Sequence, residues 1–140
     1  MTLIVVDASA VAAWVLPSQA SAAANALVGD ARQHRFIVPH IFPIEVRSLL
    51  LAAERRGRWT RRDTEVALDQ LADLDLETVQ MDSSEDLLAV LERARSDRLS
   101  MYDAFYLHLA LTDGATLASR DKALLAAATR GGAKIMDLNP

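Results

Sequence analysis

The sequence predicts an α/β fold in which a parallel sheet is covered by helices on both faces. The chain begins with an uninterrupted, mostly β-branched apolar run at residues 3–6, which is typical of a strand buried on both faces. Candidate strands and helices then alternate almost to the end of the chain. With 140 residues, 51% of them hydrophobic, the chain is large enough for one domain with a substantial core.

The first third of the chain is expected to hold two strands and two helices. After the first strand, residues 8–16 have the composition of a short helix, which Pro17 ends because proline cannot continue it. Ser18 is the expected N-cap of a second, alanine-rich helix that reaches about residue 33. Residues 36–38 then form a short strand.

The middle of the chain carries helices with clear end signals. Pro43 suits the first turn of a helix, and the apolar spacing carries this helix to Gly57, which fits the position just beyond its C-terminus. Thr60 and Asp63 have the spacing of a capping box, and they open a helix that ends near residue 74.

The second half of the chain returns to alternating strands and helices. Ser100 and Asp103 repeat the capping-box spacing, and the helix that they open ends at Gly114. The other expected elements are a strand at 76–81, a helix from Ser83 or Ser84 to about residue 98, a strand at 115–119, a helix at 121–130 and, after a turn at Gly131 and Gly132, a strand at 133–136.

The composition excludes several classes of protein. Without cysteine the chain has no disulfide and no cysteine-ligated zinc, which fits a cytoplasmic location. No apolar run approaches the roughly 20 residues needed to span a bilayer, and the N-terminus lacks the basic region of a signal peptide. Since the net charge is −4, any anionic substrate needs a local basic patch or bound cations.

Four acids, Asp7, Glu45, Asp103 and Asp121, occupy equivalent places in this arrangement. Asp7 and Asp121 follow strands and precede helices, while Glu45 and Asp103 lie in the first turns of helices. Each is explained equally well as a cap or as a partner of the helix dipole. In a parallel α/β sheet, however, these corners face the edge where ligands bind, and four carboxylates there repel unless cations neutralise them. A set of oxygen ligands suits Mg²⁺ or Mn²⁺ and phosphoryl chemistry.

Four segments carry these acids in sequence order: IVVDAS at residues 4–9, PIEV at 43–46, YDAFYLHLA at 102–110 and LASRD at 117–121. Together they resemble the four motifs of PIN-domain ribonucleases, and most closely those of VapC-type toxins from bacterial toxin–antitoxin pairs. The resemblance implies a single PIN domain over residues 1–140. It also implies a three-layer α/β fold with a five-stranded parallel sheet flanked by helices.

The same resemblance implies a Mg²⁺-dependent endoribonuclease, with Mn²⁺ as a substitute, that hydrolyses RNA phosphodiester bonds with metal-activated water. Asp7, Asp103 and Asp121 are then metal ligands. Glu45 either ligates the metal or orients its water. We expect all four to be catalytic and metal-binding residues.

Three further residues are expected to support this site. Ser119 and Ser9 would hydrogen-bond a ligand or a water, and Arg120 lies where it can hold phosphate. Ser119 stands where the family often has Thr, and Ser48 where it often has Asn. Neither departure removes a carboxylate, so we expect an active enzyme.

The resemblance also implies partners. They are an RNA substrate and a cognate VapB-type antitoxin that keeps the enzyme inactive. Trp14, Leu16 and the helix at 44–51, placed near the surface, favour a homodimer and a toxin–antitoxin hetero-oligomer in which the antitoxin's C-terminal segment covers an apolar groove.

Several interpretations stay open at this point. The basic run at residues 55–62 either contacts RNA or is a solvated corner between helices in which Trp59 covers the core. A phospho-receiver domain is a second candidate, although it needs adjacent acids after the first strand and Lys at the end of the last, whereas Lys134 starts the last strand here. A catalytically inactive PIN binding module is the third, and the presence of all four acids argues against it.

Overall fold

The computed structural model describes all 140 residues and contains a five-stranded sheet in the order β3-β2-β1-β4-β5. The strands are β1 (Thr2–Val6), β2 (His34–Pro39), β3 (Glu77–Val79), β4 (Thr116–Ser119) and β5 (Ile135–Asp137). All four pairings are parallel, as predicted. The order differs from the 2-1-3-4-5 order of receiver domains, which removes that alternative.

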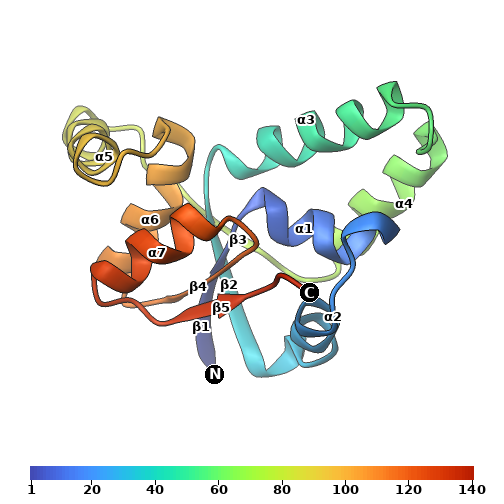
Figure 1. Cartoon of the computed structure of the whole chain (residues 1–140), viewed down its shortest axis with the longest axis horizontal. Helices are drawn as coiled ribbons and strands as arrows, with labels where there is room; N and C mark the ends of the chain where they lie inside the picture. The colour runs from blue at the N-terminus through green and yellow to red at the C-terminus, as the bar shows by residue number, and fades with distance from the viewer.

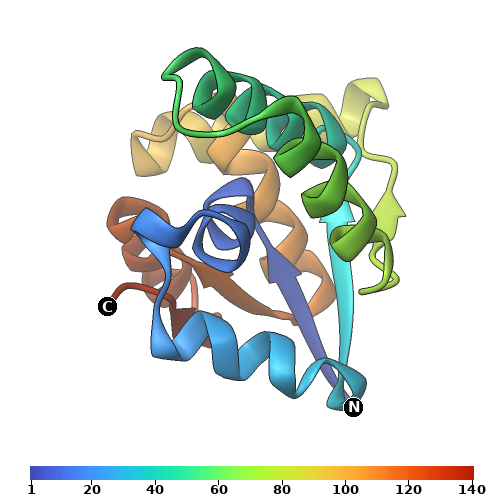
Figure 2. The ribbon, with the colours of Figure 1, turned by 90° about the vertical axis from the view of Figure 1, so that its right-hand side faces the viewer.

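Helices cover both faces of the sheet, so the predicted three-layer architecture is confirmed (Figure 1). The helices are α1 (Ala8–Val15), α2 (Ala22–Gly29), α3 (Phe42–Arg55), α4 (Arg61–Ala72), α5 (Ser84–Asp97), α6 (Met101–Asp113) and α7 (Lys122–Arg130). One face carries α6 and α7, with α5 packed on the outer side of α6. On the other face, α1 and α2 lie in front of the central strands, below α3 and α4 (Figure 2). No helix combines the length and the apolarity needed to cross a membrane.

Strand β1 confirms the prediction that the apolar run at residues 3–6 is a buried strand. Ile4, Val5 and Val6 are completely buried, because β1 has a neighbour on each side and helices on both faces. Strand β1 lies between β2 on one side and β4 on the other, so the connections after β1 and after β4 leave the sheet toward opposite faces. The chain therefore leaves a crevice between the carboxyl ends of β1 and β4, where open α/β sheets bind ligands.

The second helix differs from the prediction at both ends. Ser21, not Ser18, is its N-cap, and the Ala24 N–H donates to Ser21 Oγ at 3.1 Å. The proline at residue 17 instead begins a separate 3₁₀ turn, η1 (Pro17–Gln19). The helix ends at Gly29 rather than near residue 33, because glycine is a poor helix former, and a second 3₁₀ turn, η2 (Ala31–Gln33), follows.

The predicted capping boxes have different outcomes. At α4 the box is complete, since Asp63 N donates to Thr60 Oγ1 at 3.0 Å and Thr60 N donates to Asp63 Oδ2 at 2.8 Å. At α6 only half forms: Asp103 N donates to Ser100 Oγ at 3.1 Å, without a return bond from Ser100 N. The Asp103 carboxylate is therefore not used to cap its own helix.

Two other expectations need correction. The strand predicted at 76–81 is only Glu77–Val79, because β3 is an edge strand that pairs with β2 alone. The last strand starts at Ile135 instead of residue 133. Leu16, expected near the surface, is buried with 5% of its area exposed, since it packs with Ala12 and Ala53.

Candidate active site

Asp7 and Asp121 lie on the two sides of the crevice. Asp7 directly follows β1 and caps α1, because Ala10 N donates to its Oδ1 at 3.1 Å. Asp121 follows β4 and caps α7, with Leu124 N donating to its Oδ1 at 3.0 Å. Both acids are therefore helix caps, as one of the two interpretations of the sequence predicts. The capping bonds also fix both carboxylates at the carboxyl edge of the sheet.

Ser9 and Ser119 join the two corners. The Ser119 hydroxyl donates to Asp7 Oδ2 at 2.6 Å and accepts from Asp121 N at 2.9 Å. The Ser9 hydroxyl donates to Asp7 Oδ1 at 2.7 Å and accepts from Arg120 N at 2.9 Å. Both oxygens of the buried Asp7 carboxylate are therefore held by hydroxyl donors, which fixes the orientation of this side chain.

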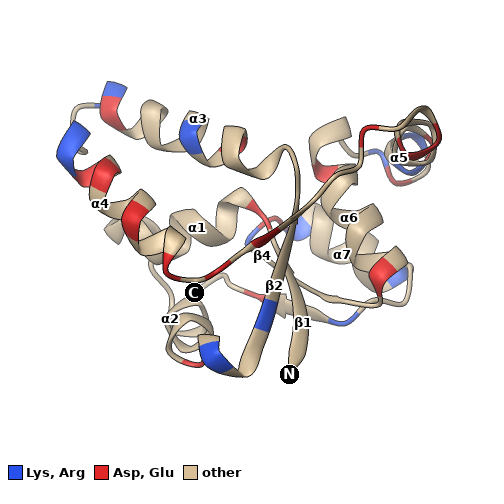
Figure 3. Ribbon diagram, turned by 180° about the vertical axis from the view of Figure 1, so that it is seen from behind, with Lys and Arg blue, Asp and Glu red and all other residues tan.

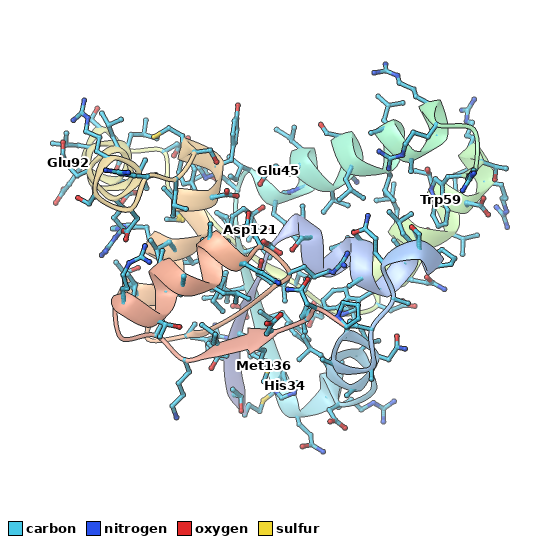
Figure 4. The ribbon with its side chains drawn as sticks, viewed as in Figure 1. His34, Glu45, Trp59, Glu92, Asp121 and Met136 are labelled. Carbon is cyan, nitrogen blue, oxygen red and sulfur yellow. The ribbon has the colours of Figure 1, made fainter.

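Glu45 and Asp103 come from helices on opposite sides of the crevice. Glu45 lies in the first turn of α3, and Tyr106 of α6 donates its hydroxyl to Glu45 Oε1 at 2.6 Å. Figure 4 shows Glu45 at the start of α3 and Asp121 at the start of α7. Sequence reasoning missed the role of Tyr106, although its place three residues after Asp103 on one helix was a usable signal, since such residues share a face.

Burial and the charges of nearby carboxylates raise the pKa values of Asp7, Glu45 and Asp103. Burial raises the pKa of Asp103 to about 6, and repulsion from Asp121, Asp7 and Glu45 adds to the shift. Burial also raises the pKa of Asp7, with a further contribution from the charge of Asp121, against the hydrogen bonds from Ser119 and Ser9. Burial raises the pKa of Glu45, and the charge of Asp7 adds to this, while the bond from Tyr106 opposes it. Each of these three acids is thus harder to ionise mainly because it is buried, and the charge of another carboxylate adds to the effect.

The donors at this edge are all oxygens, which suits a hard divalent cation. As the side chains stand, no group of three His, Cys, Asp or Glu residues is close enough to enclose an ion. The five main surface hollows are lined by other residues. The four carboxylates therefore offer oxygen donors around the crevice without forming a closed set of ligands.

Arg120 is anchored in a way that the sequence did not suggest. Its Nη1 donates to Gln19 Oε1 of η1 at 2.6 Å, and its Nε is buried without a partner. Asn139 Nδ2 donates to the Arg120 carbonyl at 2.9 Å. The side chain therefore ties the β4–α7 corner to η1, and its contact with phosphate stays a prediction.

The comparisons with known proteins agree with this fold. A family model of the PIN domain matches residues 4–130. PAE2754 from Pyrobaculum aerophilum is 24% identical, with a TM-score of 0.68 over 96% of this chain and 89% of that one. VapBC2 from Rickettsia felis, solved bound to a DNA fragment from the promoter, is 12% identical, with a TM-score of 0.66 over 99% of this chain and 100% of that one.

FitAcB from Neisseria gonorrhoeae is 15% identical, with a TM-score of 0.62 over 96% of each chain. No curated protein sequence matches this one. At these identities the likeness to the solved structures shows the fold alone. The family model, however, covers most of the chain and all four motif segments, and this chain therefore belongs to the PIN domain family.

Proposed function

We propose that this protein is a divalent-metal-dependent endoribonuclease. PIN domains are generally nucleases, so membership of the family supports hydrolysis of a nucleic acid. The observation that supports the proposal is the placement of four acids around the crevice: Asp7 and Asp121 cap helices at the carboxyl edge, and Glu45 and Asp103 lie in the first turns of α3 and α6. Such a repulsive cluster is costly unless a cation occupies it.

The four carboxylates are the residues that would hold Mg²⁺ or Mn²⁺, which when bound neutralises charge on the phosphodiester and makes a water more acidic. Ser9 and Ser119 keep the Asp7 carboxylate in one orientation through their hydroxyl bonds. Tyr106 does the same for Glu45 through Oε1. Glu45 Oε2 accepts no hydrogen bond from the protein, so this atom is free to orient a water or take its proton.

RNA cleavage by purified protein tests the proposal. We expect cleavage only with Mg²⁺ or Mn²⁺, and we expect Asp7→Asn to abolish it while the fold is retained. Asp69→Asn is the matched control, because Asp69 is an exposed acid on α4 and the same atom change there leaves the edge intact. Undiminished cleavage in excess EDTA contradicts the metal requirement, and a folded parent that cuts no RNA favours an inactive binding module.

We further propose that the protein is the VapC-type toxin of a toxin–antitoxin pair. The motif resemblance supports this, as does the fold shared with VapBC2 from Rickettsia felis. Large apolar side chains are also exposed on three neighbouring helices: Ile44 (70%), Leu88 (60%) and Tyr102 (58%). Such a surface favours burial under a second copy of the chain or an antitoxin.

Expression in a bacterial host tests the toxin role. Expression of the parent alone should arrest growth, and the product of the neighbouring upstream gene should relieve the arrest. Asp7→Asn should be harmless, which separates toxicity by catalysis from toxicity by overproduction. Unimpaired growth with a catalytically active parent counts against the toxin role, and sedimentation of purified protein as a monomer counts against the homodimer.

A further inference from the structure

The largest of the five main surface hollows, about 570 Å³, lies where α3 ends beside η1. Leu16, Ala53 and Trp59 supply its apolar part, and Arg56 and Arg58 supply its charged part. Both arginines are exposed, whereas the apolar side chains belong to a small buried cluster. The hollow therefore combines a preformed apolar surface with two exposed cations.

Trp59 is fixed in this hollow by hydrogen bonds. Its Nε1 donates to Thr64 Oγ1 at 3.1 Å, and that hydroxyl donates to Glu54 Oε2 at 2.8 Å. The indole also packs beside the buried cluster of Ala12, Leu16 and Ala53. A ligand that stacks on this ring meets a surface that is already ordered, so little conformational entropy is lost on binding.

The positive charge around the hollow is not neutralised within the protein. Arg55, Arg56 and Arg58 take part in no ion pair. The acids nearby already have partners: Glu54 bonds to Thr64, Asp63 closes the capping box of α4, and Glu65 pairs with Arg61 and Arg62. Figure 3 shows basic segments at the tip where α3 turns into α4. Because the whole chain carries a net charge of −4, this excess of free guanidinium groups is local.

The hollow is connected to the carboxylates by a single helix. Glu45 lies in the first turn of α3 and Arg56 caps its other end, so they are about 16 Å apart along the axis. Figure 4 shows Glu45 and Trp59 toward the two ends of this helix. A single strand of nucleic acid that runs along α3 can reach both places.

We propose that this hollow is a binding site for single-stranded RNA, in which a base stacks on Trp59 and backbone phosphates pair with Arg56 and Arg58. RNA as the ligand rests on the proposed function. Guanidinium groups match phosphate with paired hydrogen bonds, and an aromatic face accepts any base, which together form a sequence-tolerant single-strand site. A run of Asp and Glu side chains offers carboxylates but no flat ring for Trp59, whereas every nucleotide of RNA supplies both a phosphate and a ring, so RNA fits both halves of the hollow better.

RNA binding in EDTA, where metal-dependent cleavage is stopped, tests the site. The double variant Arg56→Ala with Arg58→Ala should bind a single-stranded RNA at least about tenfold more weakly at low salt and lower the slope of log affinity against log salt by about 1.4. The control, Arg32→Ala with Lys134→Ala, removes two exposed cations at the opposite edge of the sheet and should leave both quantities unchanged. Equal weakening in the two double variants overturns the site.

Fluorescence tests the stacking contact. The chain has two tryptophans, so Trp14→Phe leaves Trp59 as the only reporter, and RNA should quench its emission. Trp59→Leu keeps an apolar side chain in the cluster and should weaken RNA binding with the protein still folded, as judged by its melting curve. Polyglutamate is the peptide probe: quenching by polyglutamate as strong as by RNA overturns the RNA assignment in favour of an acidic protein partner.

These measurements separate the two proposals. If the parent binds RNA through the arginines but never cleaves it, the site stands and the nuclease proposal fails. If the parent cleaves RNA but the arginine variant binds like its control, the nuclease proposal stands and the site fails. With an active parent, the arginine variant should also cleave a long single strand more slowly, while a dinucleotide, too short to reach the hollow from the carboxylates, is cleaved at the parental rate.

Discussion

Tyr106 is the residue at which the core and the carboxyl edge are coupled. Only 1% of its area is exposed, yet its hydroxyl reaches Glu45 Oε1 at 2.6 Å. Burial and the hydrogen bond to Glu45 raise the pKa of the phenol far above its ordinary value, so the hydroxyl keeps its proton and donates to Glu45 at neutral pH. The packing of one ring in the core thus sets the position of an acid at the candidate active site.

Removing this hydroxyl should affect both stability and metal dependence. Tyr106→Phe keeps the ring but leaves the half-buried Glu45 carboxylate without a donor, so we expect the free energy of unfolding to fall by about 2 kcal/mol. The Mg²⁺ concentration for half-maximal cleavage should rise, because Glu45 is no longer held. Tyr102→Phe, at an exposed tyrosine on the same helix, should leave both unchanged. If Tyr106→Phe lowers stability but leaves the metal dependence unaltered, Tyr106 contributes to stability only and does not position Glu45 for metal binding.

Asp103 gives the metal-free protein a distinct pH dependence. Its pKa rises from 3.8 to about 6 on folding, so the folded state holds the proton more tightly than the unfolded state. This contributes stability that is fully present below about pH 4 and is lost as the pH rises through about 6. After allowance for partial solvent screening, the loss amounts to about 1–2 kcal/mol.

Melting curves in EDTA check this dependence. Asp103→Asn cannot ionise, so it should melt at a higher temperature than the parent above pH 6, with the difference shrinking toward pH 4. Loss of a negative charge in the first turn of α6 opposes the gain by about 0.3–1 kcal/mol. Asp69→Asn, far from the edge, should follow the parent at every pH. A difference that does not change with pH would falsify the raised pKa of Asp103.

At the scale of elements, helix ends do most of the positioning. Asp7 and Asp121 are held at the edge because each caps a helix that begins directly after a strand. Asp103 lies in the first turn of α6, and that helix ends at Gly114 with φ +63°. The start and length of each helix therefore decide where its acid stands relative to the sheet.

Two glycines in open surroundings test the helix ends by opposite effects. Gly114→Ala should lower the free energy of unfolding by about 1–2 kcal/mol, because a Cβ is strained at positive φ although no atom lies within 4 Å of it. Gly29→Ala, at a helical position with equally free space, should raise it by about 0.5–1 kcal/mol. Chemical denaturation measures both, and shifts of the same sign would contradict the helix ends assigned here.

At the scale of the whole molecule, metal binding and folding are linked. An ion that binds only the folded state stabilises it by about 2.7 kcal/mol at a hundred times its dissociation constant. Millimolar Mg²⁺ or Mn²⁺ should therefore raise the melting temperature of the parent. Asp7→Asn and Asp103→Asn should respond less, since each removes one carboxylate from the shared site. If metal shifts all three proteins equally, the acids are structural caps and do not form a shared metal site.

The strands and most helix ends could be predicted from the sequence because their signals are local. The apolar run of β1, the box of Thr60 and Asp63 and the glycine at residue 57 each act within a few residues of their own position. The predicted helix ends were wrong where two local signals compete for the same role. Ser18 and Ser21 both suit an N-cap, and only the 3₁₀ turn begun by Pro17 leaves Ser21 with the extended backbone that a cap needs.

The sequence by itself determined the alternation of strands and helices. It also determined that the acids lie at equivalent corners, because a parallel sheet brings the carboxyl ends of its strands to one edge. The tertiary structure alone decided the contacts between distant residues. Ser9 meets Ser119 because β1 and β4 are neighbours in the sheet, and Glu45 meets Tyr106 because α3 and α6 begin at the same edge. Such partners, 110 and 61 residues apart, leave no periodic trace in the sequence, since strand order and helix packing bring them together only in the folded chain.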